Sequence, residues 1–437
     1  MNLRSSCSHA NRGNKIKILT ADMLRLVRPA KFAMNFLSDE QYLLILCAGI
    51  QHDEKTSARI FDILQQKPDW NLILKDAKRL GMIPLLYKHL SEKFPDYVPH
   101  EIMRQLKENF IHQSLIRFRI FVQIHQLVQA MNSRNIPVIL LKGSFLAKEI
   151  YRDITLRPMS DIDILVKEHD IQKVLDVMTE TGYTQADNQN DQIHESRPAY
   201  YHSQLHEKLF ARKESHLPPF FIPNGVRVEV HIHIFPGMYY DSEIMDQVWK
   251  SAEEYLSDGE PVYHLSPEDM LIHLCVHLHE SIRDKAGNVD LYWFCDIHEV
   301  LKYYEKRIDW RLFCKRAEKA GVSPETGAVL HLIKENWDSP VPDAVLSRIG
   351  KGTERLRITT VFYADQDKTH FQYYIIRFRS IMKIPGWRER IYFLLRFIFP
   401  AKEYLKERYG LKNSEKLGYY YFIHPFMTVI RMIRRLF

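Results

Sequence analysis

The run DIDILV, residues 161–166, constrains the fold more than any other stretch of this chain. It alternates polar and apolar residues with a period of two, which predicts a β-strand whose apolar side chains point into the core. Asp161 and Asp163 then share the opposite face, with their backbones about 7 Å apart. Two like charges on a buried strand are costly unless a cation neutralises them, so this pair indicates a divalent-metal site.

A second alternating run, VRVEVHIHIF (226–235), repeats the pattern. Its apolar face would consist of Val226, Val228, Val230, Ile232 and Ile234. Its polar face would consist of Arg227, Glu229, His231 and His233. If the two strands are neighbours with aligned polar faces, Glu229 becomes a third carboxylate beside Asp161 and Asp163. Three carboxylates of this kind can hold the two metal ions, about 3.5 to 4 Å apart, that serve phosphoryl and nucleotidyl transfer.

A glycine turn precedes the two aspartates in the sequence. NIPVILLKG (135–143) predicts a buried strand that ends at Gly143, and SFLAKEIY predicts a short helix with Ser144 as its N-cap. A glycine at a strand-to-helix turn lets backbone N–H groups approach a phosphate closely. Gly-Ser upstream of an Asp-x-Asp strand, with an acid on a later strand, therefore indicates a site for a phosphorylated ligand.

These segments, in the order LKGSFLAKEIY, LRPMSDIDILV and RVEVHIH, resemble the DNA polymerase beta-like nucleotidyltransferase superfamily. In particular they resemble a family of uncharacterised bacterial nucleotidyltransferases with an LKG segment and an L-R-P-M-x-D-I-D-L-L-V core. DWNLILKDAKRLGMIPLLYKHL resembles that family's upstream helices, SPEDMLIHLCVHLHES and FCDIHEVL its downstream helices, and FPAKEYLKERYG its C-terminal segment. The resemblance covers residues 38–437.

The resemblance implies a fold and a set of site residues. The fold is α+β, with a small mixed β-sheet core flanked by N-terminal and C-terminal helical regions. Asp161, Asp163 and Glu229 would bind catalytic Mg²⁺ or Mn²⁺. Gly143 and Ser144 would cradle the phosphates of a nucleoside triphosphate such as ATP. The enzyme would move a nucleoside monophosphate to the hydroxyl of an unidentified acceptor, a protein or a small molecule, with Glu229 or Asp163 taking the proton.

The spacing between the turn and the aspartates departs from the superfamily pattern. Sixteen residues separate Ser144 from Asp161, more than in the compact motif, so LAKEIYRDITLRPM is interpreted as an insertion within the site. Arg157 is expected to contact the triphosphate, and Lys142 is a weaker candidate for the same role. His231 is expected to hydrogen-bond the carboxylates or a phosphate.

Two other functions are compatible with the same residues. A catalytically silent binding module would keep the fold and act through a basic C-terminal region. A zinc-dependent hydrolase would use His231 and His233, because His-x-His on a strand is a known ligand spacing. His273 and His277, one helical turn apart, lack the glutamate of a metalloprotease motif and are interpreted as structural, with Asp296 orienting one of them or capping a turn.

Hydrophobic periodicity divides the chain into five regions. They are a basic N-terminal arm (1–37), a helical region (38–131), a nucleotidyltransferase core (132–262), a second helical region (263–350) and a basic, aromatic, amphipathic C-terminal region (351–437). A long helix in the first helical region is predicted to have one face made of Leu115, Phe118, Phe121, Val122, His125 and Val128. HEKLFARK (206–213) predicts a further strand of the core, and Ser266 is the expected N-cap of a helix that follows it.

The net charge of +7 is unevenly distributed along the chain. Residues 1–34 carry seven basic side chains against one acidic one, and residues 351–437 carry eighteen against seven, so the middle is near −10. An acidic core does not favour long nucleic acid as a partner. The basic C-terminal region could contact anionic lipid or an acidic partner, although a solvated basic surface is the simpler and favoured explanation.

Cysteine usage and hydropathy indicate a cytoplasmic protein. The five cysteines are scattered and form no C-x-x-C pair, which is typical of reduced thiols. No apolar stretch reaches the roughly 18 residues of a membrane span. The basic arm before Met34 is expected to be disordered or to precede the true start of translation.

Overall fold

The computed structural model describes residues 37–185, 216–235, 242–284, 289–350 and 356–363. The strand predicted at 206–213 and the C-terminal region beyond residue 363 lie outside the described residues. The elements below all belong to one compact unit that begins at Asp39.

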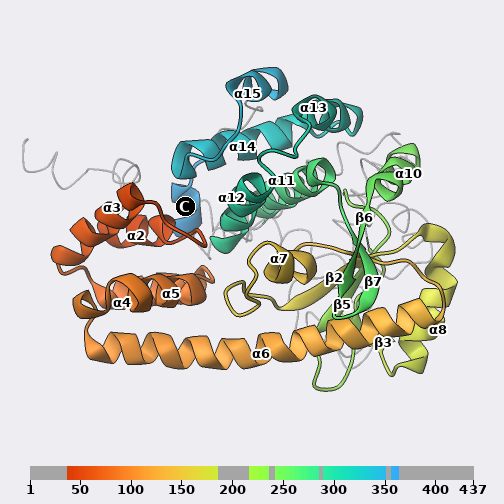
Figure 1. The fold of residues 1–437 in the computed structure, drawn as a ribbon, viewed down its shortest axis with the longest axis horizontal. Helices are drawn as coiled ribbons and strands as arrows, with labels where there is room; N and C mark the ends of the chain where they lie inside the picture. The colour runs from red at the N-terminus through yellow and green to blue at the C-terminus, as the bar shows by residue number, and fades with distance from the viewer. Residues whose placement is uncertain (1–36, 186–215, 236–241, 285–288, 351–355, 364–437) are drawn as a thin grey trace, which may run out of the picture. The chain divides into compact units, whose positions relative to one another are not determined.

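A seven-stranded mixed sheet forms the centre of the core, with strand order β3-β4-β5-β2-β1-β7-β6. The strands are β1 (Ile139–Leu140), β2 (Asp161–Leu165), β3 (Thr184–Gln185), β4 (Phe220–Phe221), β5 (Arg227–His231), β6 (Glu253–Ser257) and β7 (Glu260–His264). β2 runs parallel to β5 and antiparallel to β1, and β1 runs parallel to β7. Figure 1 shows helices on both sides of this sheet, which confirms the predicted α+β class.

The two alternating runs form neighbouring strands with aligned faces, as expected. The register places Asp161 opposite Arg227 and Asp163 opposite Glu229. The apolar residues of both strands, Ile162, Ile164, Val228 and Val230, are fully buried. β5 ends at His231 rather than at Phe235, so the predicted alternation does not continue, and His233 is buried while Ile232 is only half-buried.

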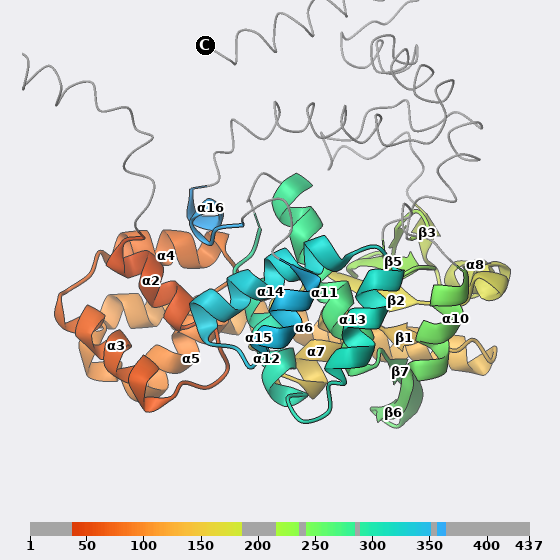
Figure 2. The ribbon, with the colours of Figure 1, turned by 90° about the horizontal axis from the view of Figure 1, so that it is seen from above.

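One long helix connects the N-terminal helices to the sheet. The N-terminal helices are α2 (Asp39–Leu46), α3 (Glu54–Gln65), α4 (Trp70–Arg79) and α5 (Ile83–Lys93), and the long helix is α6 (His100–Ser133). In Figures 1 and 2, α6 extends from beside α5 to the strands, where it contacts β7 and β2. This helix therefore holds the N-terminal helices and the sheet in one body.

The face of α6 that the periodicity predicted is only partly buried: Phe121 and Val128 are buried, and His125 is half-buried. Leu115, Phe118 and Val122 are exposed, each with more than half of its surface accessible. The face toward the core instead includes the polar residues Arg117 and Gln123, which are buried. The expectation failed in part because α6 is apolar on both faces, and because its buried polar side chains bind backbone groups of the core.

Gln123 and Arg117 attach α6 to the segments that carry the candidate site. The Gln123 side chain pairs with the backbone of Val226: its Nε2 donates to the carbonyl oxygen over 2.9 Å, and its Oε1 accepts from the N–H over 2.9 Å. Arg117 Nε donates to the carbonyl oxygen of Arg157 over 2.9 Å. Buried backbone groups at the start of β5 and in the loop before β2 are satisfied in this way.

The remaining helices lie within the core or follow it. They are α7 (Gly143–Glu149), α8 (Ile171–Glu180), α10 (Ser242–Ser251), α11 (Pro267–Asp284), α12 (Tyr292–Tyr303), α13 (Trp310–Lys319), α14 (Ser323–Trp337), α15 (Asp343–Ile349) and α16 (Thr359–Phe362). Ser266 caps α11 as predicted, because its hydroxyl accepts from the N–H of Asp269 over 3.3 Å. Among the described residues, no helix is both long and apolar enough to cross a membrane.

A buried ion pair joins α12 to the loop that precedes β2. Arg157 Nε donates to Asp296 Oδ1 over 2.8 Å, and Nη2 donates to Oδ2 over 2.7 Å. The two side chains are 6% and 2% exposed. Tyr151 donates its hydroxyl to Asp296 Oδ1 over 2.8 Å. The role predicted for Asp296, orienting a histidine or capping a turn, is therefore wrong, since its carboxylate is occupied by Arg157 and Tyr151.

Replacement of Asp296 by Asn should destabilise the whole unit. The substitution keeps the size of the side chain and leaves the Arg157 guanidinium buried without its counter-ion, for which we expect a loss of about 3 to 5 kcal/mol in the free energy of unfolding. Urea denaturation followed by circular dichroism measures this loss. Glu318→Gln is the matched control, because it breaks an ion pair with Arg348 whose two side chains are about half exposed. Equal stability of the two variants would contradict this account.

Candidate active site

A cavity of about 370 Å³ opens between the polar faces of β2 and β5 and the helices α11 and α12. Ligand-binding pockets of proteins have volumes of this order. The residues that line it are Lys142, Gly143, Arg157, Pro158, Met159, Ser160, Asp161, Asp163, Arg227, Glu229, Leu274, His277, Ser281, Asp290, Tyr292, Trp293 and Asp296. The cavity is therefore lined by six of the eight residues predicted to form the nucleotide and metal site: Lys142, Gly143, Arg157, Asp161, Asp163 and Glu229.

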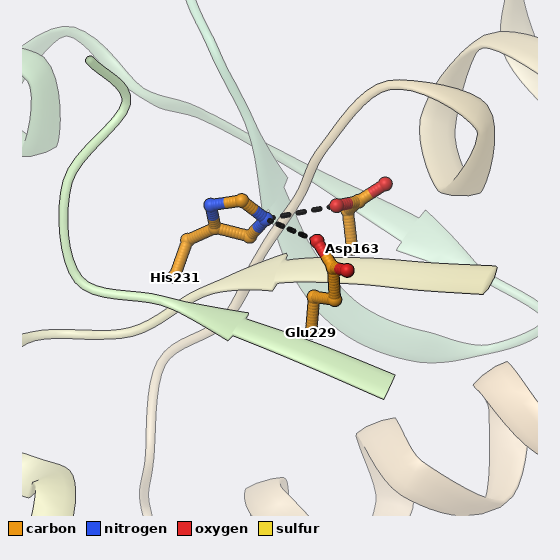
Figure 3. A group of neighbouring side chains, drawn as sticks. All are labelled: Asp163, Glu229 and His231. Carbon is orange, nitrogen blue, oxygen red and sulfur yellow. Dashed lines mark hydrogen bonds and ion pairs between the residues drawn. The ribbon is translucent and has the colours of Figure 1, made fainter. Parts of the chain in front are cut away.

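Asp163 is the most enclosed of the three carboxylates. Its Oδ1 accepts from Lys142 Nζ over 3.0 Å and from His231 Nε2 over 2.8 Å. Figure 3 shows that the His231 ring also faces Glu229, and its Nε2 lies 3.8 Å from Glu229 Oε2. Asp163 and Glu229 are brought together because they occupy paired positions on adjacent parallel strands.

Arg227 lies between the other two carboxylates. Its Nη2 is 2.7 Å from Asp161 Oδ2 and 3.0 Å from Glu229 Oε1. The three acids are thus compensated by Arg227 and Lys142, with His231 as an additional donor. The polar wall of the cavity holds both carboxylates and cations, which is the composition expected where metal ions and phosphates are bound together.

The neighbours of the two aspartates shift their pKa values in opposite directions. Burial would raise the pKa of Asp163, but Lys142 and His231 outweigh it and hold that pKa well below the usual range. Burial and the adjacent charge of Asp163 raise the pKa of Asp161. Burial lowers the pKa of His231, which keeps the imidazole neutral near pH 7. Asp163 is therefore ionised over the whole physiological range.

The glycine turn lies at the edge of the same cavity. α7 begins at Gly143, and Lys142 is its N-cap with a φ of 44°, a value that is uncommon for a residue with a side chain. A Cβ at position 143 would collide with the guanidinium of Arg157 and lie 2.9 Å from Met159 Cγ. Only glycine fits here without displacing Arg157.

Ser144 does not have the position that the sequence predicted for an N-cap and phosphate-binding residue. It is not the N-cap of α7, since the helix has already begun at Gly143 and no side chain caps it. The residue is 1% exposed and is absent from the cavity lining. Among the described residues, its hydroxyl has no hydrogen-bond partner.

Arg157 lines the cavity, but two of its three guanidinium nitrogens bind Asp296. Its Nε and Nη2 both donate to Asp296. The remaining nitrogen, Nη1, lies beside Gly143 and donates to the carbonyl oxygen of Pro158 over 3.2 Å. The Tyr292 ring packs against the guanidinium, with its centroid 5.2 Å from Cζ. Arg157 thus joins the glycine turn, the loop before β2 and α12.

The donor set suits a hard divalent cation. Asp163, Glu229 and His231 each offer one ligand atom, and these atoms lie within 4.8 Å of one another. Ligating histidines usually donate their second ring N–H to an acceptor, but in the described part of the chain His231 Nδ1 is buried without a partner. The geometry therefore favours a His231 that donates its Nε2–H to Asp163, and it leaves carboxylate oxygens, the preferred ligands of Mg²⁺ and Mn²⁺, for the metal. His233 does not belong to this cluster.

Sequence reasoning missed several residues that position the site. Arg117 and Gln123 are such residues, and their only signal was that polar side chains interrupt an apolar helical face. Tyr292 and Trp293 on the opposite cavity wall were also missed, because LYWFCDIHEVLKYY reads as an ordinary amphipathic helix. Only the tertiary structure shows that its first turn lines the same cavity as the carboxylates.

Comparison with known families agrees with this geometry. A model of a family described as uncharacterised nucleotidyltransferases matches residues 66–338, more than half of the chain. The protein belongs to this nucleotidyltransferase family. The matched segment runs from the end of α3 to the end of α14 and includes every residue of the cavity. No curated protein and no solved structure matches the chain.

His273 of α11 is buried and structural. Its Nδ1 donates to the carbonyl oxygen of Ile234 over 2.6 Å, and the residue is 4% exposed. Burial, with a further contribution from the charge of Lys142, lowers the pKa of His273 to about 3. The unfolded chain takes up a proton at this histidine near pH 6.5, whereas the folded protein resists it until about pH 3.

Stability should therefore fall as the pH falls from about 6.5 towards 3, and His273→Gln should reduce this dependence. One fewer proton taken up on unfolding lowers the slope by about 1.4 kcal/mol per pH unit within that window. Urea denaturation at several pH values between 7 and 4 measures the slope. His112→Gln, at an exposed position of α6, should leave the slope unchanged. The same slope in wild type and in His273→Gln would refute the assignment.

Proposed function

We propose that this protein transfers a nucleoside monophosphate from a nucleoside triphosphate to an acceptor hydroxyl, with release of pyrophosphate. The observation that carries the proposal is the register of β2 and β5, which gathers Asp161, Asp163 and Glu229 at one cavity beside the glycine turn. Membership of the nucleotidyltransferase family supports the same chemistry.

The carboxylates have different tasks in this proposal. Asp161, Asp163 and Glu229 would hold Mg²⁺ or Mn²⁺ through their oxygens. When bound, the metal supplies Lewis-acid stabilisation of the charge that develops at the α-phosphate. His231 keeps the Asp163 carboxylate ionised and oriented by donating Nε2–H to Oδ1.

In this proposal the cations of the cavity bind the triphosphate. Lys142 and Arg227 are bound to the carboxylates through single oxygen atoms, and both line the cavity. With metal bound to the acids, these two side chains would contact phosphate oxygens and offset the charge of the leaving pyrophosphate. The backbone at Gly143 and Nη1 of Arg157 complete the phosphate side.

The acceptor hydroxyl loses its proton to a carboxylate. Asp163 is a poor base because Lys142 and His231 hold its pKa well below the usual range. Glu229 is half-buried, lines the cavity and is the better placed of the two acids considered for this step. The acceptor oxygen then forms a bond to the α-phosphorus, the bond from that phosphorus to pyrophosphate breaks, and the proton remains on Glu229.

Substitution of Asp163 by Asn should abolish the transfer. Loss of a metal-binding carboxylate removes several kcal/mol of transition-state stabilisation, so we expect a fall in rate of at least about 100-fold. The measurement is incorporation of label from α-labelled nucleoside triphosphates, in Mg²⁺ or Mn²⁺, into a panel of hydroxyl-bearing acceptors that includes the protein itself.

Asp258→Asn is the matched control for this experiment. Asp258 lies in the turn between β6 and β7, has a φ of 52° that Asn readily adopts, and does not line the cavity. It should transfer label at the wild-type rate. Equal transfer by Asp163→Asn and the wild type would contradict the proposal, and nucleotide binding without any transfer by the wild type would favour a catalytically silent binding module.

A further inference from the structure

We infer that the wall of the cavity formed by α11 and α12 is a binding site for the nucleobase, which stacks on Trp293. This inference rests on the proposed function and adds to it a base-binding site opposite the carboxylates. Trp293 is half-buried and lines the cavity in the first turn of α12. A flat indole surface in a cavity of this kind is suited to a planar heteroaromatic ring.

The two walls of the cavity differ in the charged groups that they carry. The sheet side and its loops contribute three cations, Lys142, Arg157 and Arg227, alongside the three acids of β2 and β5. The described lining residues from Leu274 to Asp296 include Asp290 and Asp296 but neither lysine nor arginine. Among the described lining residues, the lysine and arginine side chains that can contact phosphate oxygens are therefore all on the sheet side, whereas the α11–α12 wall is suited to an uncharged ring. A nucleoside triphosphate has these two parts at its opposite ends.

Neighbouring aromatic groups support the Trp293 ring. Its centroid lies 4.8 Å from that of His277, at an interplanar angle of 55°, and 6.2 Å from that of Tyr292 in an edge-to-face arrangement. His277 also lines the cavity, from the face of α11. The indole is therefore supported by both helices that form this wall.

The same contacts fix the distance between the base site and the phosphate site. Tyr292 packs on the guanidinium of Arg157, and Arg157 touches the glycine turn and is bound to Asp296 on α12. Trp293 lies on α12 beside Tyr292. A chain of buried, directly contacting groups thus connects the stacking surface to Gly143. A preorganised site of this kind binds its ligand with little loss of conformational freedom.

The test compares ligands with and without a base. Affinities of the full-length protein for a non-hydrolysable nucleoside triphosphate and for inorganic tripolyphosphate are measured by isothermal titration calorimetry in Mg²⁺. Trp293→Leu should weaken nucleotide binding by about tenfold, the size of a lost base–aromatic stack, and should change tripolyphosphate binding by less than about twofold. Trp293→Phe, which keeps a flat ring, should recover most of the affinity.

Trp249→Leu is the matched control. Trp249 is also half-buried, packs on Lys167 with its ring centroid 5.1 Å from Nζ, and does not line the cavity. It should leave both affinities unchanged. Nucleotide binding that Trp293→Leu does not alter, or a parallel loss of nucleotide and tripolyphosphate, would overturn the base site and leave the proposed transfer reaction standing. A wild-type protein that binds no nucleotide would overturn both.

Discussion

The buried pair of Arg157 and Asp296 is the interaction on which the arrangement of this site depends. It connects residues 139 positions apart in the sequence, and both side chains are almost fully enclosed. A buried pair is costly to desolvate and is maintained only when its geometry and hydrogen bonds are good. Here two parallel hydrogen bonds, the hydroxyl of Tyr151 and the ring of Tyr292 provide that setting. Because the same guanidinium touches Gly143, the pair also sets the position of α12 relative to the glycine turn and so closes the cavity between the sheet and the helices.

Charge inside the cavity is organised around a second constraint, the placement of three acids on one face of two strands. Asp161 and Glu229 share Arg227, and Asp163 is held by Lys142 and His231. Each acid therefore has a partner that keeps the fold stable before any substrate arrives. The same partners are cations or N–H donors, which are the groups that phosphate oxygens bind. In this account the charges that stabilise the folded protein also serve the substrate, because Lys142 and Arg227 would bind phosphate oxygens while the acids would hold metal.

The sequence predicted the parts of this site that depend on local periodicity. Alternation in DIDILV and VRVEVHIHIF was enough to put Asp161, Asp163 and Glu229 on matching faces, and the register of β2 and β5 confirms that arrangement. Long-range polar contacts leave no such periodic signal. In the sequence, Asp296 looks like an ordinary residue of an amphipathic helix, and no local pattern indicates that it binds Arg157. The buried face of α6 was only partly predicted for the same reason, because Arg117 and Gln123 are buried where they hydrogen-bond backbone groups that lie far away in the sequence.

The central claim is that the carboxylates of β2 and β5 bind metal, and that the triphosphate of a nucleotide binds in the same cavity. A crystal structure of the full-length protein with Mn²⁺ and a non-hydrolysable nucleoside triphosphate, with the anomalous signal of manganese recorded, tests it most directly. The account predicts manganese peaks at the oxygens of Asp161, Asp163 and Glu229, with the triphosphate beside Gly143 in the same cavity. Manganese bound away from these three residues, or a nucleotide bound outside the cavity, would contradict it.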